Sequence, residues 1–136
     1  MKLVIAAFAG SIVCLVTGTI IAILMQPYIA PHFGTHIRTE EQGLLFPALL
    51  AGYFVIGATL TWVAMLTDAS AKSWPWVLQT GAALGLAIFL GDHLITAGWS
   101  QLAAIPMTIS GTLDALSIVA SFCAIALVLK RRSVIR

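Results

Sequence analysis

Four long apolar runs, separated by short polar segments, constrain the fold of this chain more than any other feature. The runs cover residues 3–25, 43–67, 76–98 and 104–129. Each is long enough for the roughly 20 residues that a helix needs to cross a hydrocarbon core of about 30 Å. They are too long for the strands of a membrane barrel, and they lack the alternation of such strands. We therefore predict an all-α, polytopic membrane protein: four transmembrane helices in one antiparallel bundle, with residues 1–136 as a single domain embedded in the lipid bilayer.

The few charged residues indicate how this bundle is oriented. Charged residues make up only 9% of the chain, against about 25% in soluble proteins. Most of the basic residues lie near the two termini or in the loop between the second and third runs: Lys2, Lys72, Lys130, Arg131, Arg132 and Arg136. By the positive-inside rule these segments face the cytoplasm. We expect a multi-pass protein of the bacterial inner membrane with both termini cytoplasmic, and no nucleic acid partner.

Three ionisable residues inside the apolar runs mark the candidate site: Asp92, His93 and Asp114. An acid in hydrocarbon costs roughly 2.5 to 3.5 kcal/mol on insertion scales, so it usually faces a bundle interior or a water-filled cavity. At 1.5 Å per residue, Asp92 and Asp114 lie about 10 Å and about 15 Å below the outer interface. The short turn between their helices makes those helices neighbours. We expect the three residues to form one cluster in the outer half of the bundle.

Polar and small residues extend this cluster along helix faces. In the third run Gly81, Gly85, Asp92 and Trp99 share a face, and the fourth run carries Ser110, Gly111, Asp114, Ser117 and Ser121 at spacings of three and four. Tyr53 of the second run needs a partner for its buried hydroxyl, for which we expect one of the acids. The predicted ligand- or proton-binding residues are therefore Asp92, His93, Asp114, Tyr53, Ser110 and Ser117.

The charge of this site follows from the lack of lysine or arginine within the four runs. Two neighbouring carboxylates in apolar surroundings resist joint ionisation. We expect at most one negative charge, balanced by protonated His93 or by a bound cation. A purely structural role, in which the acids hold helices together, is an equal alternative.

The first run carries small residues at strict four-residue spacing: Ala6, Gly10, Cys14, Gly18 and Ala22. Such a stripe lets a second backbone approach closely. The stripe predicts helix packing, either within the chain or, through Gly10 and Gly18, in a homo-oligomer or a larger membrane complex.

The outer loop contains the only other candidate ligands. Pro27 and Pro31 are expected to end the first helix. His32, His36 and Glu40 then recur every four residues, and imidazole and carboxylate groups can bind zinc or copper. Because Pro31 and Gly34 disfavour a helix there, we prefer a solvated loop. No metal is predicted, and the sequence identifies no cofactor.

One stretch resembles a known group of proteins. The sequence GLAIFLGDHLITAGWSQL from Gly85, followed by GTLDALSIVAS ending at Ser121, is similar to the last two helices of small four-span bacterial inner-membrane proteins of unassigned function. The resemblance covers the C-terminal third and implies a fold but no activity. We therefore predict a membrane protein whose outward-facing Asp/His site binds a small or lipid-like ligand or couples to protons. The alternatives are an intramembrane acid–base enzyme, such as an isomerase or mutase acting on an apolar substrate, and a non-catalytic accessory subunit.

Overall fold

The computed structural model describes residues 1–33 and 41–130 of the chain. Its elements are α1 (Lys2–Phe33), α2 (Phe46–Leu66), α3 (Trp74–Gly85), the π-helical segment η2 (Leu86–Leu90), α4 (Gly91–Trp99) and α5 (Ala104–Lys130). The elements from α3 to α4 form one continuous helix, Trp74–Trp99, so that four helices are long and apolar enough to cross a membrane. Within the described ranges there is no strand. The predicted all-α fold with four candidate spans is confirmed.

The first helix is longer than the sequence predicted. Pro27 and Pro31 lie inside α1, which ends only at Phe33, so the expected end near residue 25 is wrong. A proline removes one backbone donor and strains the turn before it. Membrane helices nevertheless tolerate proline, because neighbouring groups and small backbone adjustments satisfy the freed carbonyls. The other predicted helix ends differ from the observed ones by no more than a few residues.

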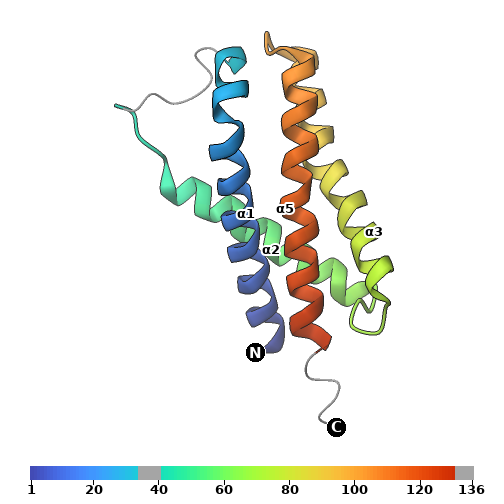
Figure 1. Cartoon of the computed structure of the whole chain (residues 1–136). Helices are drawn as coiled ribbons and strands as arrows, with labels where there is room; N and C mark the ends of the chain where they lie inside the picture. Colours follow the sequence, from blue (N-terminus) through green and yellow to red (C-terminus); the bar gives the residue numbers. More distant parts are fainter. Residues whose placement is uncertain (34–40, 131–136) are drawn as a thin grey trace.

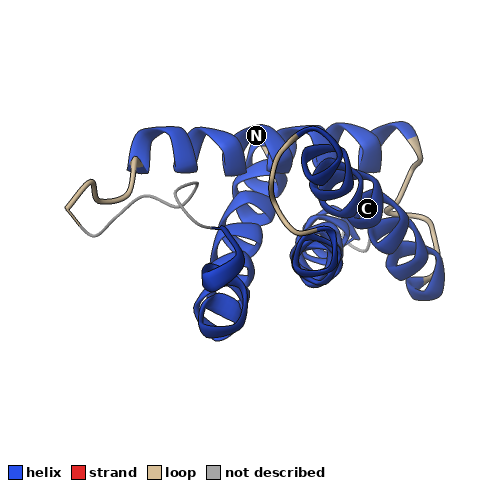
Figure 2. Cartoon of the chain, turned by 90° about the horizontal axis from the view of Figure 1, so that it is seen from above, coloured by secondary structure: helices blue, strands red, loops and turns tan. Residues whose placement is uncertain are grey.

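Three of the helices stand side by side, and the fourth crosses them. Helix α5 lies between α1 on one side and the α3–α4 helix on the other, whereas α2 runs obliquely across α1 and α5 (Figures 1 and 2). The N-terminus and the end of α5 lie at the same end of the bundle (Figure 1). We call the opposite half, which carries the turn between α4 and α5, the distal half.

The core forms where α5 meets the other helices. Its fully buried side chains include Ile118, Phe122 and Ile125 of α5 and Leu60 of α2. Glycines bring the backbones close together: a Cβ atom at Gly85 would lie 2.5 Å from the carbonyl oxygen of Ala115. Small residues at helix contacts let van der Waals packing replace the hydrophobic drive that is missing between helices in lipid.

The small-residue stripe of α1 packs inside the chain. A Cβ atom at Gly10 would lie 2.6 Å from the Ile125 side chain of α5, and one at Gly18 would lie 2.8 Å from the Tyr53 hydroxyl of α2. Both glycines are buried. The stripe therefore serves the internal contacts of α1, and an oligomer formed through it stays a prediction.

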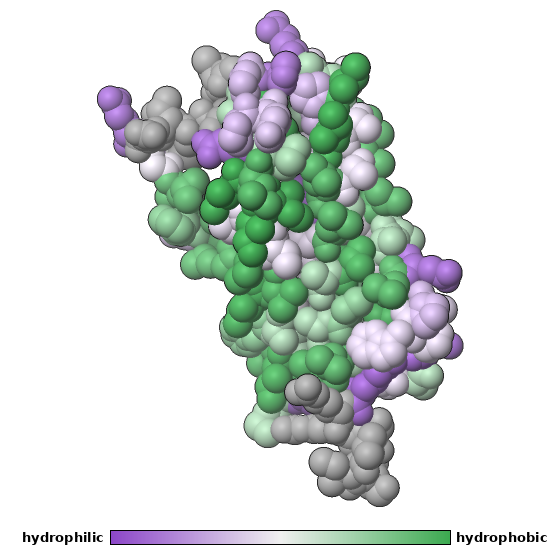
Figure 3. Space-filling model, viewed as in Figure 1, coloured by the Kyte–Doolittle hydropathy of each residue, from purple (hydrophilic) through white to green (hydrophobic). Residues whose placement is uncertain are grey.

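The chain distributes polarity as a membrane protein would. Hydrophobic residues cover the middle of the face in Figure 3, with hydrophilic residues towards the two ends. At the end near the termini, Lys130 Nζ donates a hydrogen bond of 2.6 Å to the carbonyl oxygen of Lys72. The same ammonium lies 4.4 Å from the centre of the Trp74 ring. These contacts tie the end of α5 to the loop that precedes α3.

Candidate functional site

An ion pair between two helices forms the centre of the candidate site. His93 Nε2 of α4 lies 3.7 Å from Asp114 Oδ2 of α5, and the two side chains are only 16% and 23% exposed. Gly111 makes this approach possible, because a Cβ atom there would lie 2.9 Å from the Leu90 Cα and 3.0 Å from the His93 Cβ. The predicted association of His93 with Asp114 is thus seen in the structure.

The second ring nitrogen of His93 determines what the first can do. His93 Nδ1 lies 2.8 Å from the carbonyl oxygen of Phe89. A carbonyl oxygen only accepts hydrogen bonds, so Nδ1 carries the hydrogen. Nε2 faces Asp114 Oδ2 at 3.7 Å, which is longer than a hydrogen bond. A proton can therefore reside on either group of this pair without being shared between them.

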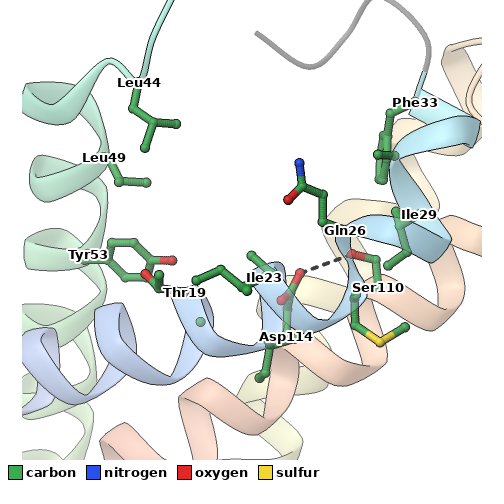
Figure 4. Close-up of a pocket in the computed structure, with 15 residues that line it drawn as sticks. Thr19, Ile23, Gln26, Ile29, Phe33, Leu44, Leu49, Tyr53, Ser110 and Asp114 are labelled. Atoms are coloured by element: carbon green, nitrogen blue, oxygen red, sulfur yellow. Dashed lines mark hydrogen bonds between the residues drawn. The ribbon is translucent and has the colours of Figure 1, made fainter. Parts of the chain in front are cut away.

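Asp114 also faces a pocket in the distal half of the bundle. The pocket has a volume of about 450 Å³ and is lined by α1, α5 and the first part of α2 with the residues that precede it. Its lining residues on α1 run from Gly18 to Phe33, in the distal half of that helix. Its walls are mostly apolar, with the side chains Ile23, Ile29, Phe33, Leu44 and Leu49 among them (Figure 4).

Several polar side chains reach this pocket from three helices. Ser110 donates a hydrogen bond of 3.3 Å to Asp114 Oδ2, and both residues line the pocket. The hydroxyl of Tyr53 and the amide of Gln26 point towards the same space (Figure 4). In the described part of the chain, Tyr53 forms no hydrogen bond with either acid. Tyr53 therefore shares a pocket with Asp114 without being its hydrogen-bond partner.

Asp92 lies apart from this site, although the sequence places it in the cluster. Its side chain is exposed, and no hydrogen bond or ion pair joins it to another described residue. The cause is η2, in which the Gly91 N–H donates to the carbonyl oxygen of Leu86, five residues earlier. In a regular α-helix two turns take about 7.2 residues, so the residue two turns after Gly85 on the same face would be Asp92. The π turn takes one residue more, so His93 faces α5 instead.

Ser117 belongs to the packing of the bundle rather than to the pocket. Its hydroxyl is buried, donates a hydrogen bond of 2.6 Å to the Asp114 carbonyl oxygen and accepts one of 3.6 Å from the Cys14 thiol. One turn further on, Ser121 donates to the carbonyl oxygen of Gly10 at 2.9 Å. The polar stripe of α5 is therefore divided: its distal part lines the site, and the rest holds α1 against α5.

Two polar residues of the pocket were not predicted from the sequence. Thr19 and Gln26 of α1 line the pocket, seven positions apart and hence on one helix face. That seven-residue spacing is visible in the sequence and is the signal that could have identified them.

The weak metal candidates do not form a site among the described residues. His32 lies exposed in the last turn of α1, whereas His36 and Glu40 lie outside the described residues. Within the described ranges, no group of three or more His, Cys, Asp or Glu side chains could hold a metal ion.

Comparisons with other proteins leave the site to be interpreted from its own geometry. The resemblance of the last two helices to small four-span bacterial proteins remains an expectation. No protein-family model, no curated protein and no solved structure matches this chain.

Proposed function

We propose that this chain is a membrane protein that binds a small amphipathic molecule of the lipid class in its distal pocket. The observation that supports this most directly is an apolar pocket of about 450 Å³ with a paired acid, Asp114, in its wall. Ligand pockets typically have volumes of about 300 to 1,000 Å³, apolar walls and a few converging polar groups. A binding role accounts for both the apolar walls and the polar groups.

The placement of the polar groups also favours binding over a purely structural role. A residue that only holds helices together directs its polar atoms at a neighbouring helix, as Ser121 does. Asp114 contacts His93 of the neighbouring helix through Oδ2, but it also bonds to Ser110 of its own helix and lines the pocket. Because an acid next to lipid is costly, a ligand that hydrogen-bonds to Asp114 lowers the free energy of the bundle.

We propose further that ligand binding is coupled to a proton that can reside on either His93 or Asp114. A ligand that donates a hydrogen bond to Asp114 stabilises the carboxylate, and the proton then resides on His93. A ligand that accepts a hydrogen bond favours the protonated acid. The polarity of the ligand thereby sets the position of the proton.

The proposed location follows from the basic residues near the termini. We propose that the protein resides in a bacterial inner membrane with both termini in the cytoplasm, as the positive-inside rule favours. The distal pocket would then lie in the outer half of the bilayer.

The binding proposal is tested by blocking the pocket. Ala22 lines it, so Ala22→Phe should fill part of the space, whereas Ala87→Phe on the exposed surface adds the same volume outside. Each variant is purified in mild detergent with its native lipids, and bound lipids are identified by mass spectrometry. We expect a lipid present with the wild type and with Ala87→Phe but lost from Ala22→Phe. Identical lipids on all three proteins, with equal thermal stability, would contradict the proposal.

Acid–base catalysis is a second candidate, because Asp114 reaches the pocket while His93 can store a proton behind it. A catalysed isomerisation would exchange C–H hydrogen of the bound lipid with solvent. After incubation in deuterated water, mass spectrometry should find deuterium in the lipid bound to the wild type and none with His93→Gln. Absence of deuterium from the lipid bound to the wild type would leave binding alone.

A further inference from the structure

We infer that the molecule bound in the distal pocket is an uncharged lipid alcohol whose hydroxyl group lies between Asp114 and Tyr53. This inference rests on the proposed binding function and narrows it to one chemical class. It depends on the charges that line the pocket, on the hydrogen-bonding capacity left open there, and on the ion pair behind Asp114.

The charges of the lining disfavour an anionic lipid. Among the described residues, the pocket lining includes the acid Asp114 but no lysine, arginine or histidine. A phosphate or carboxylate head group would therefore enter apolar surroundings next to a like charge, without a cationic partner from the described lining. Burial of an unpaired charge is strongly unfavourable.

The hydrogen-bonding groups of the pocket match a hydroxyl group. Asp114 uses Oδ2 towards Ser110 and His93, while for Oδ1 no partner is found in the described part of the chain. The Tyr53 hydroxyl likewise has no partner among the described residues, and it faces the pocket from the opposite wall (Figure 4). A hydroxyl group offers one donor and two acceptor sites. It can donate to Asp114 and accept from Tyr53.

The ion pair disfavours a lipid amine. His93 Nε2 already lies 3.7 Å from Asp114 Oδ2, where the imidazole can take up the proton that balances a carboxylate. An ammonium group in the pocket would compete with that charge and repel it. An alcohol adds no charge and leaves the pair intact.

The rest of the ligand must be apolar. Beyond the polar groups the pocket is bounded by side chains such as Ile29, Phe33, Leu44 and Leu49. Removal of a hydrocarbon tail from water into such walls is favourable. A fatty or isoprenoid tail meets this requirement.

The inference is tested with three probes that share one tail: farnesol, farnesylamine and farnesyl monophosphate. Each is titrated into the purified, delipidated protein, and binding is measured by calorimetry. We expect farnesol to bind at least tenfold more tightly than the amine or the phosphate. Tyr53→Phe and Asp114→Ala should each weaken farnesol binding by about tenfold or more, the effect of one lost hydrogen bond to a buried partner. Asp92→Asn serves as the control and should bind farnesol as the wild type does.

The possible outcomes distinguish failure of the alcohol class from failure of the binding function. Tighter binding of the amine or the phosphate, lost in Tyr53→Phe, would overturn the alcohol class but leave the pocket as a ligand site. If no probe binds to the wild type, the proposed binding function fails together with the inference. Equal weakening of farnesol binding by Asp92→Asn and Tyr53→Phe would show that the alcohol binds elsewhere. Tyr53→Phe keeps the test valid if Asp114→Ala fails to fold.

Discussion

Adjacent residues of this chain occupy different environments. Asp92 is exposed on the surface of the bundle, whereas His93 pairs with Asp114 across α4 and α5. Both residues were expected in one site because both are ionisable and lie at similar depth. The backbone conformation before them, rather than their chemistry, determines which of the two reaches Asp114.

A double-mutant cycle can distinguish these environments. We expect His93→Gln and Asp114→Asn to show a coupling free energy of about 0.5 to 3 kcal/mol, as residues in one network do. Asp92→Asn and Asp114→Asn should be additive, because no contact joins them. Thermal unfolding in detergent supplies the free energies. Coupling between the two acids, with none between His93 and Asp114, would show that the ion pair is wrongly placed.

Glycines at helix contacts provide a second prediction at this scale. A Cβ atom at Gly85 would meet the backbone oxygen of Ala115 at 2.5 Å, whereas one at Gly98 would find no atom within 4 Å. Gly85→Ala should destabilise the protein by about 1 to 3 kcal/mol, because a backbone cannot move aside as a flexible side chain can. Gly98→Ala, measured by the same thermal unfolding, should be nearly neutral. Equal stability of both variants would contradict the close contact.

Among the elements, η2 has the largest effect on the site. It adds one residue to a turn of the long helix, so that the face of α3 that contacts α5 continues through His93 rather than through Asp92. Such π segments are rare and often occur at functional sites.

Single-residue deletions test this account of η2. Deletion of Ala87 removes the extra residue, and the resulting α-helix still turns both Gly85 and His93 towards α5. We expect this variant to fold and to keep the NMR signals of the His93 imidazole near those of the wild type. Deletion of Leu116, an exposed residue of α5, should be far more destabilising because it rotates one half of α5 by about 100°. The opposite order of stabilities would refute the register argument.

At the scale of the whole molecule, the oblique course of α2 creates the pocket. Helix α2 packs against α1 at Gly57, and its first turns lie to one side of α1 (Figures 1 and 2). Four parallel rods would close this space, whereas one inclined helix leaves room between Tyr53 and Asp114 for a ligand.

The orientation of the whole molecule in the membrane is predicted from its basic residues. Cysteines introduced at Gly34 and Ser133, in a background without Cys14 and Cys123, should differ in intact cells. An impermeant thiol reagent should label the cysteine at position 34 but not the one at position 133, because the termini are expected in the cytoplasm. Lysed cells serve as the control in which both react. Labelling at position 133 in intact cells would reverse the topology.

The sequence by itself determined the class of the fold and most of the groups that form the site. Runs of about 20 apolar residues leave helices as the main solution in a bilayer, because every backbone polar group must find an internal partner. The cost of ionisable groups in hydrocarbon likewise singles out Asp114 and His93, together with Asp92, and the spacing of the serines places Ser110 beside Asp114. These inferences depend on local chemistry and helical periodicity, which a sequence displays directly.

Only the tertiary structure decided which of these residues meet. The π turn exchanges Asp92 for His93, and no periodicity in the sequence reveals it; the end of the turn packs against Gly111 of α5. The tilt of α2 places Tyr53 across a pocket from Asp114. Ser117 is buried in the contact between α1 and α5 and does not line the pocket. Each of these outcomes depends on the fit between surfaces of different helices, which is a property of the assembled bundle and not of any one segment.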